Sequence, residues 1–379
     1  MKKGNAVLKI KKYHSLAIVM LASFALAACQ NGESDVSQAS STSSTETQSS
    51  QNQTDQLSTE YYSSYIQDGT YQINGASGLV SGDTSQANLE NLERGLYDLA
   101  QSIFATEDYS LKEGQVLSED TVNEWLGANS DDNPNGLNPA GALSETIDGF
   151  EPRYLNSIME YDFVNANGDV AGISIGLAMN YADTFTSDSD SQEVEITADQ
   201  RIEQGKAMAE TIVSRIRENE AYANIPIHIA VFENAASGDL GGGTYTTDAV
   251  SSSGTSFGDW SSYTKDYVVY GVDDAPNEED TVSFTRFRDQ VSSFYPQLSG
   301  LSGVGYYEDN ELKKINIIIN SQFDGYSEVI AVAQQAIATA NSVFKTNVEI
   351  QIQVVTADGV RALLSRPQDA DTFDYVLVN

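Results

Sequence analysis

Two short stretches, Ile173-Ser174-Ile175-Gly176-Leu177 and Ile225-Pro226-Ile227-His228-Ile229-Ala230-Val231, place a large aliphatic residue at every second position. This alternation is typical of β-strands that face a core. The chain between them carries aliphatic residues at helical spacing, with Asp199 as a candidate N-cap: Ile202, Ala209, Ile212, Val213 and Ile216. A strand, a long helix and a second strand in this order predict an α/β core.

The second half of the chain repeats this order of elements. Alternation predicts strands at 314–320 and 348–354, with a helix over 326–344 between them, then a short helix at 360–365 and a last strand at 375–378. The first strands of the two halves match as Ile173/Ile315, Ile175/Ile317 and Leu177/Ile319. Aromatic residues and an Asn/Asp turn precede both strands: Tyr161, Phe163 and Asn167-Gly168-Asp169, then Tyr306, Tyr307 and Asp309-Asn310-Glu311.

We therefore predict a mixed α+β or α/β fold of two related units with strand–helix–strand cores, a diverged tandem repeat. The alternative is that unrelated strand–helix–strand units share the same pattern, because periodicity alone cannot separate the two cases. Two helices, over 90–105 and around 122–126, precede the strands of the first unit.

Composition sets the domain boundaries. Residues 29–63 contain almost no large aliphatic side chains and predict a disordered stalk after the lipidated N-terminus. Residues 237–256 are rich in Gly, Ser, Thr and Asp around Gly241-Gly242-Gly243, and predict a linker. The first α/β unit is then expected over 64–236 and the second over 257–379.

Residues 1–28 have the form of a secretory signal peptide. Five lysines and no acidic residue precede an apolar run from Leu16 to Ala28 that only Ser23 interrupts. The run is shorter than the ~20 residues that a membrane-spanning helix needs. A positive start followed by a short apolar run predicts export.

The apolar run ends in Leu26-Ala27-Ala28-Cys29, which contains the only cysteine of the chain. This is the pattern of a bacterial lipobox, in which the thiol of Cys29 receives a diacylglycerol group and cleavage makes Cys29 the new N-terminus. Acyl chains contribute about 0.8 kcal/mol per buried CH₂, so two or more anchor a protein stably. We predict a lipid anchor in the cytoplasmic membrane, with the protein on its extracellular face. The alternative is an ordinary secreted protein with an incidental cysteine.

Charge and residue counts exclude several classes of function. The chain has 20 Lys+Arg and 55 Asp+Glu, a formal net charge of −35, which opposes binding to nucleic acid. One cysteine cannot form an intramolecular disulfide or a thiolate zinc site, and two histidines leave little material for a metal centre. We predict no cofactor and no metal.

His228 is the one histidine after the signal peptide, so any His-dependent catalytic triad must include it. Its mid-strand position favours a satisfied or solvent-facing histidine, because catalytic bases are more often found at strand ends and loops. The chain has no G-x-S-x-G, H-E-x-x-H or P-loop motif, and its carboxylates are too numerous to single out a glycosidase pair. We assign no catalytic residue.

Acidic loops and tyrosines are the remaining candidates for binding. Asp131, Asn133, Asn135 and Gly136 match the first half of a calcium loop, but Ala142 occupies the position that requires a bidentate glutamate. A second acidic stretch, 273–280, is interpreted as a solvated loop. The 20 tyrosines are interpreted as residues of cores and edge strands, and the alternative is a binding surface. Two clusters of aromatic residues are candidates for such a surface: Tyr61, Tyr62 and Tyr65, and Trp260, Tyr263, Tyr267 and Tyr270.

Several segments, in their order along the chain, carry a resemblance to a known family. They are the lipobox and six further stretches: Arg94-Gly95-Leu96, Tyr109-Ser110-Leu111-Lys112-Glu113-Gly114-Gln115, Trp125-Leu126, Gly136-Leu137-Asn138-Pro139, Pro152-Arg153-Tyr154-Leu155 and Gly176-Leu177-Ala178-Met179-Asn180. On these residues the chain resembles the CamS family of sex pheromone precursor lipoproteins of Gram-positive bacteria, over essentially the whole mature body.

The resemblance implies a second product. Signal peptidase II would cut before Cys29, and an intramembrane protease would trim the freed signal peptide to a hydrophobic heptapeptide sensed by a receptor on recipient cells. The matching residues here are Ala17, Ile18, Val19, Met20, Leu21, Ala22 and Ser23. For the mature body we predict a non-enzymatic binding protein; the alternatives are a cell-envelope hydrolase that uses acidic residues and a solute-binding lipoprotein.

Overall fold

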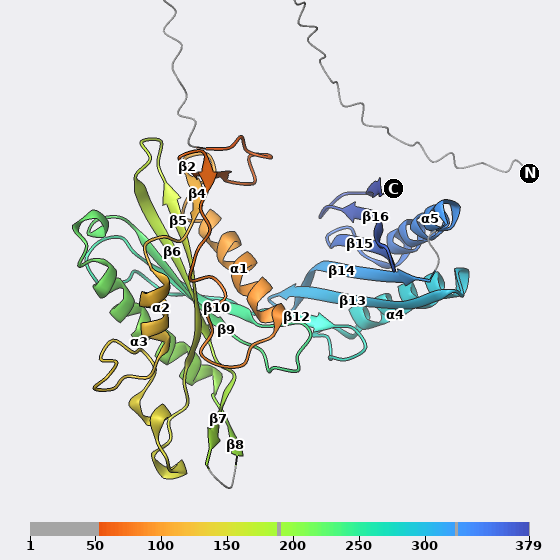
Figure 1. Cartoon of the computed structure of the whole chain (residues 1–379). Helices are drawn as coiled ribbons and strands as arrows, with labels where there is room; N and C mark the ends of the chain where they lie inside the picture. Colours follow the sequence, from red (N-terminus) through yellow and green to blue (C-terminus); the bar gives the residue numbers. More distant parts are fainter. Residues whose placement is uncertain (1–52, 188–190, 323–324, 379) are drawn as a thin grey trace, which may run out of the picture. The chain divides into compact units, whose positions relative to one another are not determined.

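The computed structural model describes residues 53–187, 191–322 and 325–378 (Figure 1). The predicted signal peptide, the lipobox with Cys29, the Ala17–Ser23 segment and most of the predicted stalk lie outside the described residues. The described chain has a mixed α+β fold with two large mixed sheets, as the sequence predicts.

The first sheet has seven strands in the order β1-β4-β5-β6-β9-β10-β11. Their bounds are β1 (Ser63–Ser64), β4 (Ser110–Glu113), β5 (Leu155–Val164), β6 (Val170–Met179), β9 (Ile227–Glu233), β10 (Thr244–Ser251) and β11 (Ser261–Ser262). Two small hairpins lie outside it: β2 (Ile66–Gln67) with β3 (Thr70–Tyr71), and β7 (Ala182–Thr186) with β8 (Ser191–Glu195).

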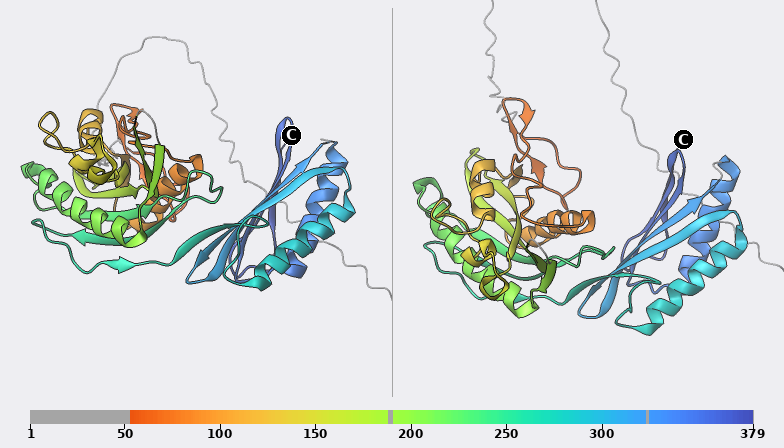
Figure 2. Two further views of the ribbon diagram at one scale, coloured as in Figure 1. Left: turned by 90° about the horizontal axis from the view of Figure 1, so that it is seen from below. Right: turned by 60° about the horizontal axis from the view of Figure 1, so that its bottom comes forward.

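Helices cover both faces of the first sheet (Figure 2). Helix α1 (Gln86–Gln101) packs on one face through Leu92, Leu96 and Leu99, against the odd-numbered residues of β5 from Met159 to Phe163. Helices α2 (Glu119–Leu126) and α3 (Ala198–Ile216) share a core with Ile173, Ile175 and Leu177 on the opposite face. Because successive side chains of a strand point to opposite faces, two cores flank one sheet.

The second sheet has six strands in the order β12-β13-β14-β15-β16-β17. Their bounds are β12 (Lys265–Val269), β13 (Leu298–Glu308), β14 (Glu311–Ser321), β15 (Glu349–Thr356), β16 (Gly359–Arg366) and β17 (Asp374–Leu377). Helices α4 (Glu278–Phe294) and α5 (Tyr326–Val343) lie side by side on one of its faces (Figure 2). They enclose a core with Ile315, Ile317 and Ile319. Short 3₁₀ turns occur elsewhere, at Ala140–Leu143, Ile147–Gly149 and Glu220–Tyr222.

The two sheets repeat one topology. Strands β4-β5-β6-β9-β10-β11 correspond in order and direction to β12-β13-β14-β15-β16-β17. In each sheet a hairpin leads into a parallel pair, β6/β9 crossed by α3 and β14/β15 crossed by α5, and another hairpin follows. The registers agree with the predicted matches, because Ile173 pairs with Ile227 and Ile315 with Ile350. A shared topology is what a duplication requires, and the duplication itself stays a prediction.

The predicted linker at 237–256 differs from the structure. Residues 244–251 form β10, which pairs with β9 inside the first sheet. The glycine run is a close-packed turn rather than a spacer: a Cβ on Gly243 would overlap the Glu233 carbonyl, and the Asn88 side chain of α1 accepts the Gly243 N–H at 2.8 Å. Thr and Asp in β10 resemble loop composition, but sheet pairing and burial decide the conformation.

The short helix predicted at 360–365 is wrong, because these residues lie in strand β16. Ala and Leu favour helix by intrinsic propensity. In the structure Ala362 and Leu364 alternate into the core and pair with β15 after a tight turn at Gly359, whose φ is +112°. Tertiary pairing overrides the local preference.

Helix starts also differ from the sequence-based interpretation in two places. Thr197, not Asp199, is the N-cap of α3 and forms a reciprocal capping box with Gln200. The acidic stretch at 273–280 is not all loop, because Glu278, Glu279 and Asp280 are the first turn of α4. Carboxylates stabilise that position through the helix dipole.

The predicted stalk ends earlier than residue 63. Tyr62 is buried, and its hydroxyl donates to the Phe104 carbonyl at 2.5 Å. Gln53 already bridges to Tyr65. The aromatic ring supplies the apolar area that the polar residues around it lack.

Candidate functional site

The one His-centred cluster that the sequence allows is present, and it spans three neighbouring strands. Ser174 on β6 lies beside His228 on β9 in the parallel register, with the Ser174 Oγ 2.7 Å from His228 Nδ1. On the other side His228 Nε2 lies 3.0 Å from Asp248 Oδ2 of β10. Because an ionised carboxylate only accepts, Nε2 donates to Asp248, and Nδ1 and the Ser174 hydroxyl share the second hydrogen bond of the ring.

Tyr263 extends this network toward the surface. Its hydroxyl donates to Asp248 Oδ1 at 3.0 Å. Burial acts to raise the pKa of the Asp248 carboxyl, but hydrogen bonds from His228 and Tyr263 and the charge of His228 outweigh it, so the pKa lies below its usual value. Asp248 is therefore a carboxylate at neutral pH, and both its oxygens have donors.

The Ser174–His228 end of the network is sealed from solvent. Ser174 and His228 are both 0% exposed, on the face that α1 covers. Glycines flank Ser174 on its strand: the Phe104 ring fills the space above Gly172, and Tyr245 fills the space above Gly176. A hydrolytic triad needs a serine that a substrate carbonyl can reach. The sequence predicts a satisfied or solvent-facing strand histidine, and the structure shows the first of these, with partners that the sequence analysis did not name.

A second buried polar group lies on the opposite face of the same sheet. Glu160 and Asp162 alternate along β5, and Glu160 accepts the N–H groups of Val116 and Leu117, both at 3.1 Å. Asp162 Oδ2 accepts the Gln115 N–H at 2.9 Å. The two carboxyls therefore hold the connection between β4 and α2. Sequence analysis missed them among the many carboxylates, although two acids at alternate positions of an apolar strand are an available signal.

Burial dominates the electrostatics of this pair. Glu160 is 1% exposed and Asp162 is 0% exposed. Burial, followed by the charge of Asp162, raises the pKa of Glu160 well above its usual value. Burial also raises the pKa of Asp162 to about 6. Two neighbouring buried carboxyls cannot both ionise cheaply, so the pair retains a proton at neutral pH.

The partial calcium loop is held together by its own amides. Asn133 Nδ2 donates to the Glu124 carbonyl at 2.8 Å, and Asn135 Nδ2 donates to Glu124 Oε1 at 3.0 Å. Within the described residues no group of three or more His, Cys, Asp or Glu side chains is placed to hold a metal ion. The Asn side chains therefore cap the end of α2.

The tyrosine clusters pack mainly into cores, as the sequence analysis favours. Tyr270 stacks on Phe284 with ring centroids 4.6 Å apart, and its hydroxyl lies 2.9 Å from that of Tyr307. Tyr62 is buried, and Tyr263 is bound to Asp248. Tyr61, 48% exposed, is more open.

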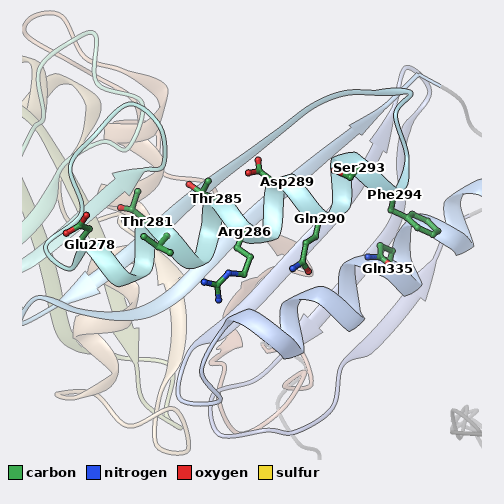
Figure 3. A pocket seen from close by; sticks show the side chains of 10 residues that line it. Glu278, Thr281, Thr285, Arg286, Asp289, Gln290, Ser293, Phe294 and Gln335 are labelled. Atoms are coloured by element: carbon green, nitrogen blue, oxygen red, sulfur yellow. The ribbon is translucent and has the colours of Figure 1, made fainter.

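A surface groove of about 820 Å³ follows the outer side of α4 (Figure 3). Its walls mix hydroxyl, amide and charged side chains with Val282 and Phe294, both about half exposed. The lining residues are Glu278, Thr281, Val282, Thr285, Arg286, Asp289, Gln290, Ser293, Phe294 and, from α5, Gln335. No acid–base pair or nucleophile with an activating partner is assembled among the described residues there.

Several motifs of the family resemblance hold the first unit together. Asn138 is 0% exposed and ties α2 to β5: its amide donates to the carbonyls of Leu126 at 2.8 Å and Leu155 at 3.0 Å. Arg153 forms a two-armed pair with Asp183 at 2.7 and 3.0 Å. These positions act in packing.

Comparison with known proteins identifies the family. A family model described as CamS sex pheromone cAM373 precursor matches residues 71–372. The chain belongs to this family. No curated protein sequence matches the chain. Within the described residues, no helix has the length and apolar character needed to cross a membrane.

Two solved structures extend the likeness to the CamS fold. The crystal structure of a sex pheromone precursor from Lactobacillus salivarius subsp. salivarius UCC118 superposes with a TM-score of 0.80 at 28% identity, over 86% of this chain and 98% of that one. The C-terminal domain of the sex pheromone staph-cAM373 precursor from Staphylococcus aureus gives a TM-score of 0.68 at 24% identity, over 77% and 97%. At 24% identity, the similarity to the Staphylococcus aureus domain shows a shared fold alone.

Proposed function

We propose that this CamS family member is a surface lipoprotein whose signal peptide is the precursor of a peptide pheromone. The observation that carries the proposal is the family match over residues 71–372, which we join to the signal peptide predicted over residues 1–28 and to the lipobox cysteine, Cys29, that follows it. A precursor family of this kind implies a secreted or surface protein. In this proposal signal peptidase II cleaves before Cys29, and the lipidated body stays on the outer face of the membrane.

The second product in this proposal is the heptapeptide from Ala17 to Ser23. It carries no charged side chain, so a recipient receptor would have to recognise shape and apolar area. An intramembrane protease would release it from the freed signal peptide. The charged lysines of the signal peptide all precede this segment and would be trimmed away.

We further propose that the mature body binds rather than catalyses. The sealed Ser174–His228–Asp248 network supports this part, because its serine is closed to any substrate in this structure. If the full chain degraded a cell-envelope polymer and Ser174→Ala abolished that turnover, the body would be an enzyme. The same activity in Ser174→Ala would place the chemistry elsewhere and would equally end the binding proposal.

The test of the precursor role is mass spectrometry of peptides in culture supernatants. Wild type should release the Ala17–Ser23 peptide, and Cys29→Ala should release none, because the uncleaved signal peptide remains attached. As a matched control, Val19→Ala should keep the release and shift the mass by the difference between the two residues. A supernatant without the peptide at good sensitivity would reduce the segment to an export signal.

Lipidation is tested separately by fractionation. Wild type should remain with membranes, whereas Cys29→Ala should lack the lipid and be poorly processed. Normal processing and normal membrane retention of Cys29→Ala would disprove the lipobox without affecting the peptide assay in the wild type.

A further inference from the structure

Residues 114–117, which we call the β4–α2 connection, are held by an unusual set of hydrogen-bond acceptors. The N–H groups of the last three residues all donate to side chains of β5, the first to Asp162 and the other two to Glu160. Backbone N–H groups need partners when they are buried, and a neighbouring strand or helix usually supplies them. Here two carboxyl groups take that role.

The β4–α2 connection lies close against the carboxyl pair and the core beneath it. A Cβ on Gly114 would overlap the side chain of Glu160, and the Gly114 N–H donates to the Glu160 carbonyl at 3.1 Å. Leu117 is buried in the same core as Val122 and Trp125 of α2. A movement of the connection would therefore admit water to the carboxyl pair and expose Leu117.

Apolar side chains surround the pair on the side of the next strand. The register partners of Glu160 and Asp162 on β6 are Ile175 and Ile173. Both isoleucines belong to the core that α2 and α3 share, and the buried residues that these helices add to that core are apolar. An ionised carboxyl in such surroundings loses the hydration that stabilises its charge.

One cation and one phenol are the other titratable groups that face the pair. Lys112 is the register partner of Asp162 on β4, and its ammonium group lies over the ring of Tyr65, 5.9 Å from the ring centroid. Burial raises the pKa of Asp162, and the charge of Lys112 lowers it only in part. The phenol is that of Tyr222, after α3, whose pKa is raised by burial and then by the charges of the pair. One cation therefore does not neutralise two carboxylates here.

The three N–H groups of the connection can stabilise one negative charge better than two. With one proton on the pair, a single charge is spread over oxygens that accept these N–H groups. A second charge has less support, because Asp162 Oδ1 is buried and accepts no hydrogen bond from any described group. The free energy that this second charge costs is recovered when the connection moves and water reaches the carboxylates.

We propose that Glu160 and Asp162 form a pH-sensitive switch, which keeps the β4–α2 connection closed while the pair holds a proton and releases it when both carboxyls ionise. The rest of the first sheet stays folded in the released state. Opening a short segment costs less free energy than unfolding a domain, so local opening precedes global unfolding. The switch responds to the loss of one proton and needs no ligand.

The direction and size of the response follow from the titration of the pair. In the closed state burial raises the pKa of Asp162 to about 6 and that of Glu160 well above its usual value. In the released state a hydrated carboxyl returns to a pKa of about 4. Closure is therefore most favoured at low pH and is lost as pH rises through the closed-state values. For Asp162 alone, the equilibrium constant of opening should increase about tenfold between pH 5 and pH 8.

Hydrogen exchange of the full chain tests the proposal at the N–H groups of the β4–α2 connection. Their protection factors, corrected for the intrinsic exchange rate at each pH, should fall about tenfold or more from pH 5 to pH 8. The N–H groups of β15 in the second sheet should keep their protection factors, because opening there exposes neither carboxyl. Equal protection of the connection at both pH values overturns the proposal. An equal fall at β15 overturns it as well, because the whole chain would then respond.

Asp162→Asn tests whether the proton is responsible. The amide keeps an oxygen for the Gln115 N–H and adds a donor that cannot ionise, so protection of the connection should be the same at pH 5 and pH 8. Asp148→Asn, at an exposed position of the same unit, is the matched control and should fall like wild type. A tenfold fall in Asp162→Asn overturns the proposal. If circular dichroism shows that Asp162→Asn does not fold, the wild-type comparison between the two pH values decides.

Discussion

The two sheets have the same strand order, but they bury different chemistry. The first sheet carries polar groups on both covered faces, the Ser174–His228–Asp248 network under α1 and the carboxyl pair Glu160 and Asp162 under α2. The second sheet buries an aliphatic and aromatic core on one face and leaves the other open. One topology therefore supports either a polar or an apolar interior, and local residues decide which.

The strand register shows which single residues of the two sheets occupy equivalent positions. His228 pairs beside Ser174 in the first sheet as Gln351 pairs beside Asn316 in the second. The first pair is covered by α1 and needs a carboxylate to satisfy its buried ring. The second pair lies on the face of its sheet opposite to α4 and α5 and carries two amides and no ionisable group. The difference teaches that the buried network is a consequence of the covering helix, not of the strands alone.

Exchanging residues between the two sheets should have its largest effect at His228. His228→Gln, which introduces the residue of the second sheet, leaves the buried Asp248 carboxylate without its main partner. We expect a loss of about 3 kcal/mol in the free energy of unfolding, measured by chemical denaturation. Gln351→His, the reverse exchange on the exposed side, should change stability by less than about 0.5 kcal/mol. Similar losses in both variants would mean that the network contributes nothing specific.

The carboxyl pair predicts a pH dependence that the second sheet lacks. Folding raises the pKa of Asp162 to about 6 and that of Glu160 well above its usual value. The stabilising contribution of the two groups to the free energy of unfolding is therefore fully present below their unfolded pKa of about 4. It is lost as pH rises through the folded values. Stability should therefore fall from pH 5 to 8, and Glu160→Gln should reduce that fall by about 1–2 kcal/mol.

The exposed Glu145 provides the control for this titration. Denaturation of Glu145→Gln at pH 5 and pH 8 should show the same fall as wild type. A wild type whose stability is flat or rises over this range would contradict a pair that retains its proton.

Sequence periodicity located the strands and helices whose residues face only one way. The stretch 173–177 lies inside β6, and the long helices after both first strands were placed correctly. The sequence predicts the wrong structure where tertiary contacts decide the conformation. The Thr and Asp residues of β10 suggest a linker, and the Ala and Leu residues of β16 suggest a helix. Asp248 lies in that supposed linker, so the network could not be assembled from sequence although His228 was named.

The last exchange concerns the glycines that replace acids in the second sheet. Register places Gly303 beside Ile317 as Glu160 stands beside Ile175. Phe284 occupies the space above Gly303, so a Cβ there would overlap its ring. Gly303→Ala should therefore lower the free energy of unfolding by about 1–3 kcal/mol, measured by chemical denaturation.

Gly300 on the same strand is the matched control, because an added Cβ meets no heavy atom within 4 Å. Gly300→Ala should change stability by less than about 0.5 kcal/mol. Combining Gly303→Ala with Phe284→Leu should cost less than the sum of the single losses, since the smaller side chain makes room. Additive losses would show that Phe284 and Gly303 do not compete for space, and that an aromatic ring does not explain why the second sheet has glycine where the first has an acid.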